Sequence, residues 1–134
     1  METNKKYDEL NAKALRYFKN SGLIRVAVAV SGSEESLILL NAAIQAFGNE
    51  NVLAVTADTG NIPENVLGII KKACDMTETE LFMVPVLTDD KCEMFGEMLH
   101  ECWLLGFDTL SCGCTDDNSC INAFDEVICP FICE

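Results

Sequence analysis

Residues 31–36 contain three serines and one glycine in the order Ser-Gly-Ser-Glu-Glu-Ser, a combination that could hold an anion. The segment lies between an apolar run and a helical pattern. Its amides would therefore open a helix, where free N–H groups and the helix dipole attract negative charge. Gly32 would let the backbone approach a ligand closely. Hydroxyl donors would come from Ser31, Ser33 and Ser36. The alternative is ordinary capping of a helix by serine, with acidic residues in its first turn.

A cysteine-rich tail is the second chemical feature. Five of the eight cysteines fall in the last 23 residues, at Cys112, Cys114, Cys120, Cys129 and Cys133. Thiolates are the ligands that zinc and iron–sulfur clusters prefer, and the first three of these thiols could hold a metal, although their spacing matches no standard motif. The alternatives are small buried hydrophobic residues, unused surface thiols, or a thiol-redox pair at Cys112 and Cys114.

The charge is strongly negative and unevenly distributed. The net charge is −13; residues 1–25 hold six Lys or Arg against three Asp or Glu, and residues 26–134 hold three against 19. Such a surface repels polyphosphate backbones, which argues against a nucleic-acid groove. Because no membrane-length apolar run and no signal-peptide pattern occurs, we expect a cytoplasmic protein that does not bind membranes.

Short apolar strands alternate with helical patterns, which predicts an α/β fold with an open parallel sheet of four to five strands and helices on both faces. The expected strands cover residues 26–30, 52–57, 81–86 and 108–112, and the expected helices cover 7–18, 36–47, 63–76 and about 90–105. The chain divides into an N-terminal amphipathic helix and lead-in (1–25), a central α/β domain (26–112) and a Cys-rich C-terminal tail (113–134). In the tail only a short helix over about 120–127 is indicated.

The stretch Val26 to Asp58 resembles the PP-loop ATP pyrophosphatases, a Rossmann-like superfamily of adenine nucleotide alpha-hydrolase type whose signature, Ser-Gly-Gly-x-Asp-Ser, follows the first strand. Within that superfamily, the chain is most similar to the LarE-type ATP-dependent sulfur transferases. The likeness rests on residues 51–58 followed by Pro63-Glu64, and on 106–108 and 113–117. It covers most of residues 23–117, and is specific in the first two strands and looser afterwards.

This resemblance implies that the central domain binds ATP with magnesium. The ATP phosphates would be held by Ser31, Gly32, Ser33 and Ser36. Ala57 and Asp58 would lie beside the adenosine, and Glu35, at the Asp position of the signature, would carry or orient magnesium. The family activates a substrate by adenylation and releases pyrophosphate.

The resemblance also implies sulfur delivery. Cys129 and Cys133 would act as sulfur carriers, or a [4Fe-4S] cluster or zinc ion would be held by Cys112, Cys114 and Cys120. Ser33 replaces the second signature glycine, and few basic residues are present to neutralise phosphate. The alternative is therefore a non-catalytic domain that binds a nucleotide, a metal or a protein. Because the resemblance stops short of the family's C-terminal half, a second copy or a separate partner chain would complete the site.

Overall fold

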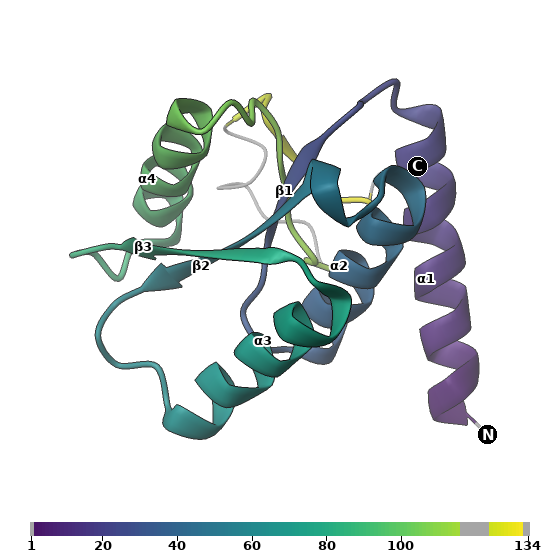
Figure 1. The fold of residues 1–134 in the computed structure, drawn as a ribbon, viewed down its shortest axis with the longest axis horizontal. Helices are drawn as coiled ribbons and strands as arrows, with labels where there is room; N and C mark the ends of the chain where they lie inside the picture. Colours follow the sequence, from purple (N-terminus) through teal and green to yellow (C-terminus); the bar gives the residue numbers. More distant parts are fainter. Residues whose placement is uncertain (1, 116–123, 133–134) are drawn as a thin grey trace.

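Strands and helices alternate along the chain in the computed structural model, which describes residues 2–115 and 124–132 (Figure 1). The elements are α1 (Glu2–Asn20), β1 (Val26–Ala29), α2 (Glu34–Phe47), η1 (Asn49–Asn51), β2 (Val52–Asp58), α3 (Glu64–Thr77), β3 (Glu80–Pro85), α4 (Lys91–Leu104), β4 (Leu110–Ser111) and β5 (Val127–Ile128). The strands form one sheet in the order β3-β2-β1-β4-β5, and every pairing is parallel. The predicted open parallel sheet is confirmed, with five strands.

Helices cover both faces of this sheet, as the sequence predicts. One core cluster joins α1, α2 and α3 to the sheet through residues such as Phe18, Leu39 and Ile70. A second cluster lies on the other face and includes Phe95 and Met98 of α4 (Figure 1). The chain crosses from one face to the other between β3 and β4. The strand order reverses between the neighbours β1 and β4, because β2 lies beyond β1 on one side and β5 lies beyond β4 on the other. In open α/β sheets the carboxyl ends of such a strand pair form the usual ligand-binding crevice.

The C-terminal tail differs from the sequence expectation. The predicted helix over about 120–127 is wrong at its C-terminal end, because Val127–Ile128 is β5 and pairs in parallel with β4. Residues 116–123 lie outside the described part of the chain. Cys129 and Phe131 follow β5 and are buried. The tail therefore supplies part of the sheet and of the core, since β4 offers an open edge with unpaired backbone groups to the strand that follows.

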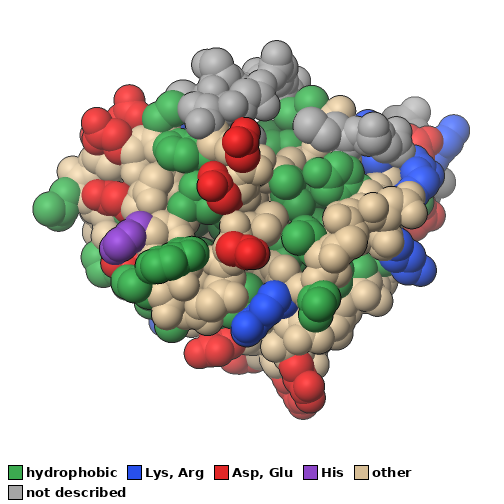
Figure 2. Space-filling model, turned by 90° about the horizontal axis from the view of Figure 1, so that it is seen from above, with side chains coloured by type: hydrophobic (Ala, Val, Ile, Leu, Met, Phe, Trp, Pro, Cys, Tyr) green, Lys and Arg blue, Asp and Glu red, His purple; other side chains and the backbone are tan. Residues whose placement is uncertain are grey.

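The surface mixes apolar side chains with carboxylates. Figure 2 shows this mixture on one face, with several Lys and Arg side chains gathered at one edge of the view. Among the described helices, none combines the length and the apolar character that a membrane crossing requires.

Candidate functional site

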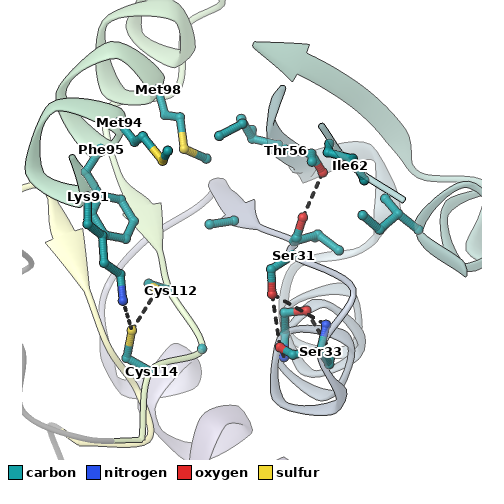
Figure 3. Close-up of a pocket in the computed structure, with 17 residues that line it drawn as sticks. Ser31, Ser33, Thr56, Ile62, Lys91, Met94, Phe95, Met98, Cys112 and Cys114 are labelled. Carbon is teal, nitrogen blue, oxygen red and sulfur yellow. Dashed lines mark hydrogen bonds between the residues drawn. The ribbon is translucent and has the colours of Figure 1, made fainter. Parts of the chain in front are cut away.

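A pocket of about 330 Å³ opens at the carboxyl ends of β1, β2 and β4 (Figure 3). We call it the edge pocket. Its lining residues come from the ends of β1 and β2, the loops after β1, β2 and β4, the first turn of α2, and the sides of α3 and α4: Ala29, Val30, Ser31, Ser33, Ser36, Val55, Thr56, Ala57, Ile62, Ile70, Lys91, Met94, Phe95, Met98, Cys112, Gly113 and Cys114. The volume lies in the range of small-molecule sites, and the position is the crevice where the strand order reverses.

The serine turn forms one wall of the edge pocket and also caps α2. The Ser36 amide donates to Ser33 Oγ at 3.2 Å, and Ser36 Oγ donates to the Ser33 carbonyl at 2.8 Å. Ser31 Oγ donates to Ser33 Oγ at 3.1 Å. Capping by serine is therefore present, but it does not use every amide. Within the described residues, the amides of Gly32, Glu34 and Glu35 have no hydrogen-bond partner, which leaves three donors at the helix N-terminus.

Two glycines allow close backbone packing around this turn. Gly32 has φ +90°, and a Cβ there would lie 2.7 Å from Val66 Cγ1 of α3. A Cβ on Gly113, in the loop after β4, would lie 3.2 Å from the backbone at Glu35 and Ser36. Gly32 thus permits the turn to sit against α3 rather than lining the pocket itself. Gly113 lets the loop after β4 reach the start of α2.

The predicted acidic residues point elsewhere. The Glu35 carboxylate lies 3.9 Å from Lys6 Nζ of α1, and the Asp58 carboxylate accepts a hydrogen bond from the Gly60 amide at 2.9 Å. Ala57 lines the edge pocket, whereas Asp58 does not. No carboxylate occurs among the lining residues in the described ranges. A magnesium role for Glu35 stays a prediction, and the arrangement gives that ion no carboxylate ligand from the described wall.

Thiols form the opposite wall. Cys112 Sγ lies 3.2 Å from Cys114 Sγ, and Lys91 Nζ donates to Cys114 Sγ at 3.8 Å (Figure 3). Cys112 is half-buried, and Cys129, whose side chain hydrogen-bonds to it, is buried. The three thiols described in the tail therefore converge, with two of them open to the pocket.

The two pocket thiols ionise differently. The hydrogen bond from Cys129 lowers the pKa of Cys112 to about 6, against the opposing effect of burial, with help from Cys114 and Lys91. Burial and the neighbouring Cys112 sulfur raise the pKa of Cys114 to about 11. Two sulfurs in contact share one proton, so the pair loses its first proton readily and holds the second. Near neutral pH, Cys112 is the thiolate of the pair, and thiolates are the nucleophilic form of cysteine.

The metal predictions find no support in the described residues. Neither 2–115 nor 124–132 holds a group of three His, Cys, Asp or Glu that could bind a metal ion. Cys120 and Cys133, predicted as a metal ligand and a sulfur carrier, lie outside the described ranges. The proposed ligand set at Cys112, Cys114 and Cys120 therefore stays a prediction. For Cys129, burial leaves little access for a substrate.

The sequence analysis missed the α4 wall. Lys91, Met94, Phe95 and Met98 all line the pocket. Their spacing of three, four and seven residues places them on one side of the helix, and this spacing could have indicated from the sequence that they form one surface. Lys91 is the only basic side chain among the described lining residues. Thr56 was also missed; its hydroxyl donates to the Val30 carbonyl at 2.8 Å and joins the ends of β1 and β2.

Comparison with known proteins identifies the fold. No protein-family model and no curated protein sequence matches the chain. An NH3-dependent NAD synthetase from Campylobacter jejuni subsp. jejuni NCTC 11168, solved with a nitrate ion, matches with 13% identity and a TM-score of 0.59 over 78% of this chain and 55% of that chain. A glutamine-dependent NAD+ synthetase from Acinetobacter baumannii, solved with ADP, matches with 20% identity and a TM-score of 0.51 over 72% of this chain and 18% of that one.

These similarities concern architecture, because the identities are low and the chain spans little more than half of the Campylobacter protein. The five-stranded parallel sheet with helices on both faces is the Rossmann-like α/β fold of these synthetases.

Proposed function

We propose that this chain binds ATP in the edge pocket and acts as an ATP-dependent adenylating or sulfur-transfer protein. The observation that carries the proposal is the start of α2. There, three amides that have no partner among the described residues lie next to serine hydroxyls that line a pocket at the strand-order reversal. Helix N-termini with free N–H groups attract phosphate. The serine turn therefore fits the polyphosphate of a nucleotide.

The remaining walls fit the other parts of a nucleotide. Met94, Phe95 and Met98 offer an apolar and aromatic surface against which a purine ring can pack. Ile62 lies across the pocket from α4 (Figure 3), and Ala57 also belongs to the lining. The fold supports the same interpretation, since it is the one that the resemblance to PP-loop ATP pyrophosphatases implied.

Bound ATP would supply an adenylyl group that activates a substrate, with pyrophosphate as the leaving group. The chain's own contribution would be to bind the phosphates through the α2 amides and to hold the substrate group that accepts the adenylyl group close to them. Sulfur delivery is the finer part of the proposal. Its support is that Cys112 and Cys114 line the pocket that would hold the nucleotide, whereas Cys129, the predicted carrier, is buried.

A second candidate is a nucleotide-binding module without catalysis. It is favoured by the walls of the edge pocket, where the described residues supply Lys91 as the only cation and no carboxylate for magnesium. Mg²⁺ in nucleotide sites usually has one or two carboxylate ligands besides the phosphates.

A charge substitution at Ser31 tests nucleotide binding. Ser31→Glu places a carboxylate beside the α2 amides, whereas Ser31→Gln has nearly the same shape and no charge. Two like charges about 5 Å apart at an effective dielectric constant of about 20 repel by about 3 kcal/mol, and salt reduces this. We expect ATP to bind the Ser31→Gln variant at least about tenfold more tightly than the Ser31→Glu variant in calorimetry.

Two results would decide between the candidates. Failure of the wild-type chain to bind ATP, or equal dissociation constants for both Ser31 variants, would remove nucleotide binding at this turn. ATP–pyrophosphate exchange in the presence of magnesium would favour the adenylating function, and binding without exchange would favour the module.

A further inference from the structure

The thiol pair on the pocket wall has a geometry of its own. Cys112 and Cys114 are separated by Gly113 in the loop that follows β4, and their sulfurs are 3.2 Å apart. A disulfide requires about 2.05 Å. A sulfur displacement of roughly 1 Å would close the bond, and side-chain rotation in a loop without regular structure can supply it. The backbone of Cys112 stays fixed by the hydrogen bond from its amide to the Ile128 carbonyl, at 2.9 Å.

Access and activation distinguish this pair from the other described thiols. Cys112 and Cys114 are half-buried and line the edge pocket. Cys74 and Cys102 are buried within helices, and the half-buried Cys92 does not line the pocket. The Lys91 ammonium approaches Cys114, and Cys129 hydrogen-bonds to Cys112 from behind. A reactive thiol needs an electropositive, partly exposed setting of this kind.

We propose that Cys112 and Cys114 form a dithiol–disulfide exchange site that reduces small aliphatic disulfides of the glutathione or cystine class. The proposal goes beyond the proposed function and does not require nucleotide. A pocket of about 330 Å³ limits the substrate to a small molecule. The carboxylates that such disulfides carry would be attracted by Lys91, while the net charge of −13 would repel acidic macromolecules.

The exchange occurs in two balanced steps. The Cys112 thiolate attacks one sulfur of R–S–S–R, which forms a mixed disulfide, Cys112–S–S–R, and expels RS⁻. Cys114 loses its proton and attacks Cys112 Sγ, which forms the Cys112–Cys114 bond and expels the second RS⁻. The proton lost by Cys114 neutralises one leaving group, and the other takes a proton from water, which holds the proton that Cys112 released when it ionised. Two protein thiols are oxidised and one small disulfide is reduced to two thiols.

Mass spectrometry of the full chain, reduced and then treated with glutathione disulfide without nucleotide, tests the proposal. Cleavage after Asp108 and Asp116 yields the peptide 109–116, whose only cysteines are Cys112 and Cys114. We expect this peptide to lose two hydrogen masses and to carry no glutathione at the end of the reaction. A peptide that keeps both thiols, or that accumulates glutathione in the wild-type chain, would overturn the proposal.

Variants assign the two roles. Cys114→Ser should stop at the mixed disulfide, with one glutathione on Cys112, and Cys112→Ser should slow the reaction of this peptide at least about tenfold. Cys92→Ser, which changes a half-buried thiol of α4 outside the pair, should leave the rate unchanged. A double variant, Cys120→Ser with Cys133→Ser, should also react normally. Loss of exchange in that double variant would show that Cys120 or Cys133 is the partner thiol, and the proposal would be wrong.

Because the assay contains no ATP, its result is independent of nucleotide binding. A chain that fails in calorimetry but forms the Cys112–Cys114 bond would lose the proposed function and keep this one.

Discussion

The close contact between the serine turn and α3 gives a quantitative prediction for Gly32→Ala. Gly32 has φ +90°, a conformation in which an L side chain is strained by roughly 1–2 kcal/mol. The new Cβ would also lie 2.7 Å from Val66 Cγ1 and 3.6 Å from Ile70 Cγ1. Val66 cannot easily rotate away, because a β-branched side chain in a helix strongly prefers one χ1 rotamer. Overpacking of this kind costs roughly 1–3 kcal/mol, so we expect a total loss of about 2–5 kcal/mol.

Gly60→Ala is the matched control. Gly60 has φ +84°, and no atom lies within 4 Å of the Cβ that alanine would add. This variant therefore reports the backbone strain alone, partly offset by the reduced entropy of the unfolded chain. The difference between the two variants isolates the clash, at about 1–3 kcal/mol. Equilibrium urea unfolding under reducing conditions, followed by circular dichroism, measures both losses through the shift of the midpoint and the slope.

A double variant tests the assigned partner. Val66→Ala removes Cγ1, the atom that the new Cβ would meet, so Gly32→Ala should cost less in this background than in the wild-type chain. The expected coupling energy is about 1 kcal/mol or more, as found for residues in direct contact. Equal losses for the Gly32 and Gly60 variants, or no coupling to Val66, would refute the steric part of the reasoning.

Three further predictions concern the edge pocket. Lys91→Met removes the only basic side chain of the described wall and should raise the dissociation constant for ATP about tenfold in calorimetry, since Lys91 is exposed and salt screens its charge; an unchanged constant would place the phosphates elsewhere. Alkylation of Cys112 by iodoacetamide, followed by mass spectrometry, should be half-maximal near pH 6 and level above neutrality, because a lowered pKa keeps the thiolate present down to about 6. Cys129→Ala should move that midpoint upward, and a rate that keeps rising to pH 9 in the wild-type chain would contradict the shift. Thr56→Val removes the buried 2.8 Å hydrogen bond to the Val30 carbonyl and should reduce the free energy of unfolding by roughly 1–3 kcal/mol in urea titration; an unchanged midpoint would show that this bond contributes no net stability.

The sequence predicts most of the fold because its signals are local and repeated. Apolar strands such as 26–30 and 52–57, each followed by a helical pattern, require a parallel sheet with crossovers, and the structure contains it. β5 was missed for a physical reason. Two residues, Val127 and Ile128, are too short to show a period, and their strand conformation depends on pairing with β4, which is distant in sequence.

The site is only partly predictable, because side-chain direction depends on neighbours from other elements. The serine turn and Ala57 border the edge pocket as expected from their positions after β1 and β2. Glu35 instead faces Lys6, a residue of α1 that no local pattern connects to α2. Lys91 was not predicted, because it is one charged residue beside the apolar Met94 and Met98, and no local pattern shows that this side of α4 lines a pocket.

The charge of the edge pocket connects its two proposed activities. Lys91 is the only cation of the described wall, and its ammonium lies 3.8 Å from a thiol whose neighbour is a thiolate near neutral pH. A phosphate group bound at the α2 amides would compete with that thiolate for the same ammonium and would be repelled by it. Unit charges about 4 Å apart interact by about 4 kcal/mol at an effective dielectric constant of about 20, before screening by salt. Oxidation to the Cys112–Cys114 disulfide removes the thiolate and leaves Lys91 to the phosphate. Since such coupling is reciprocal, bound nucleotide must favour the disulfide to the same extent that the disulfide favours nucleotide.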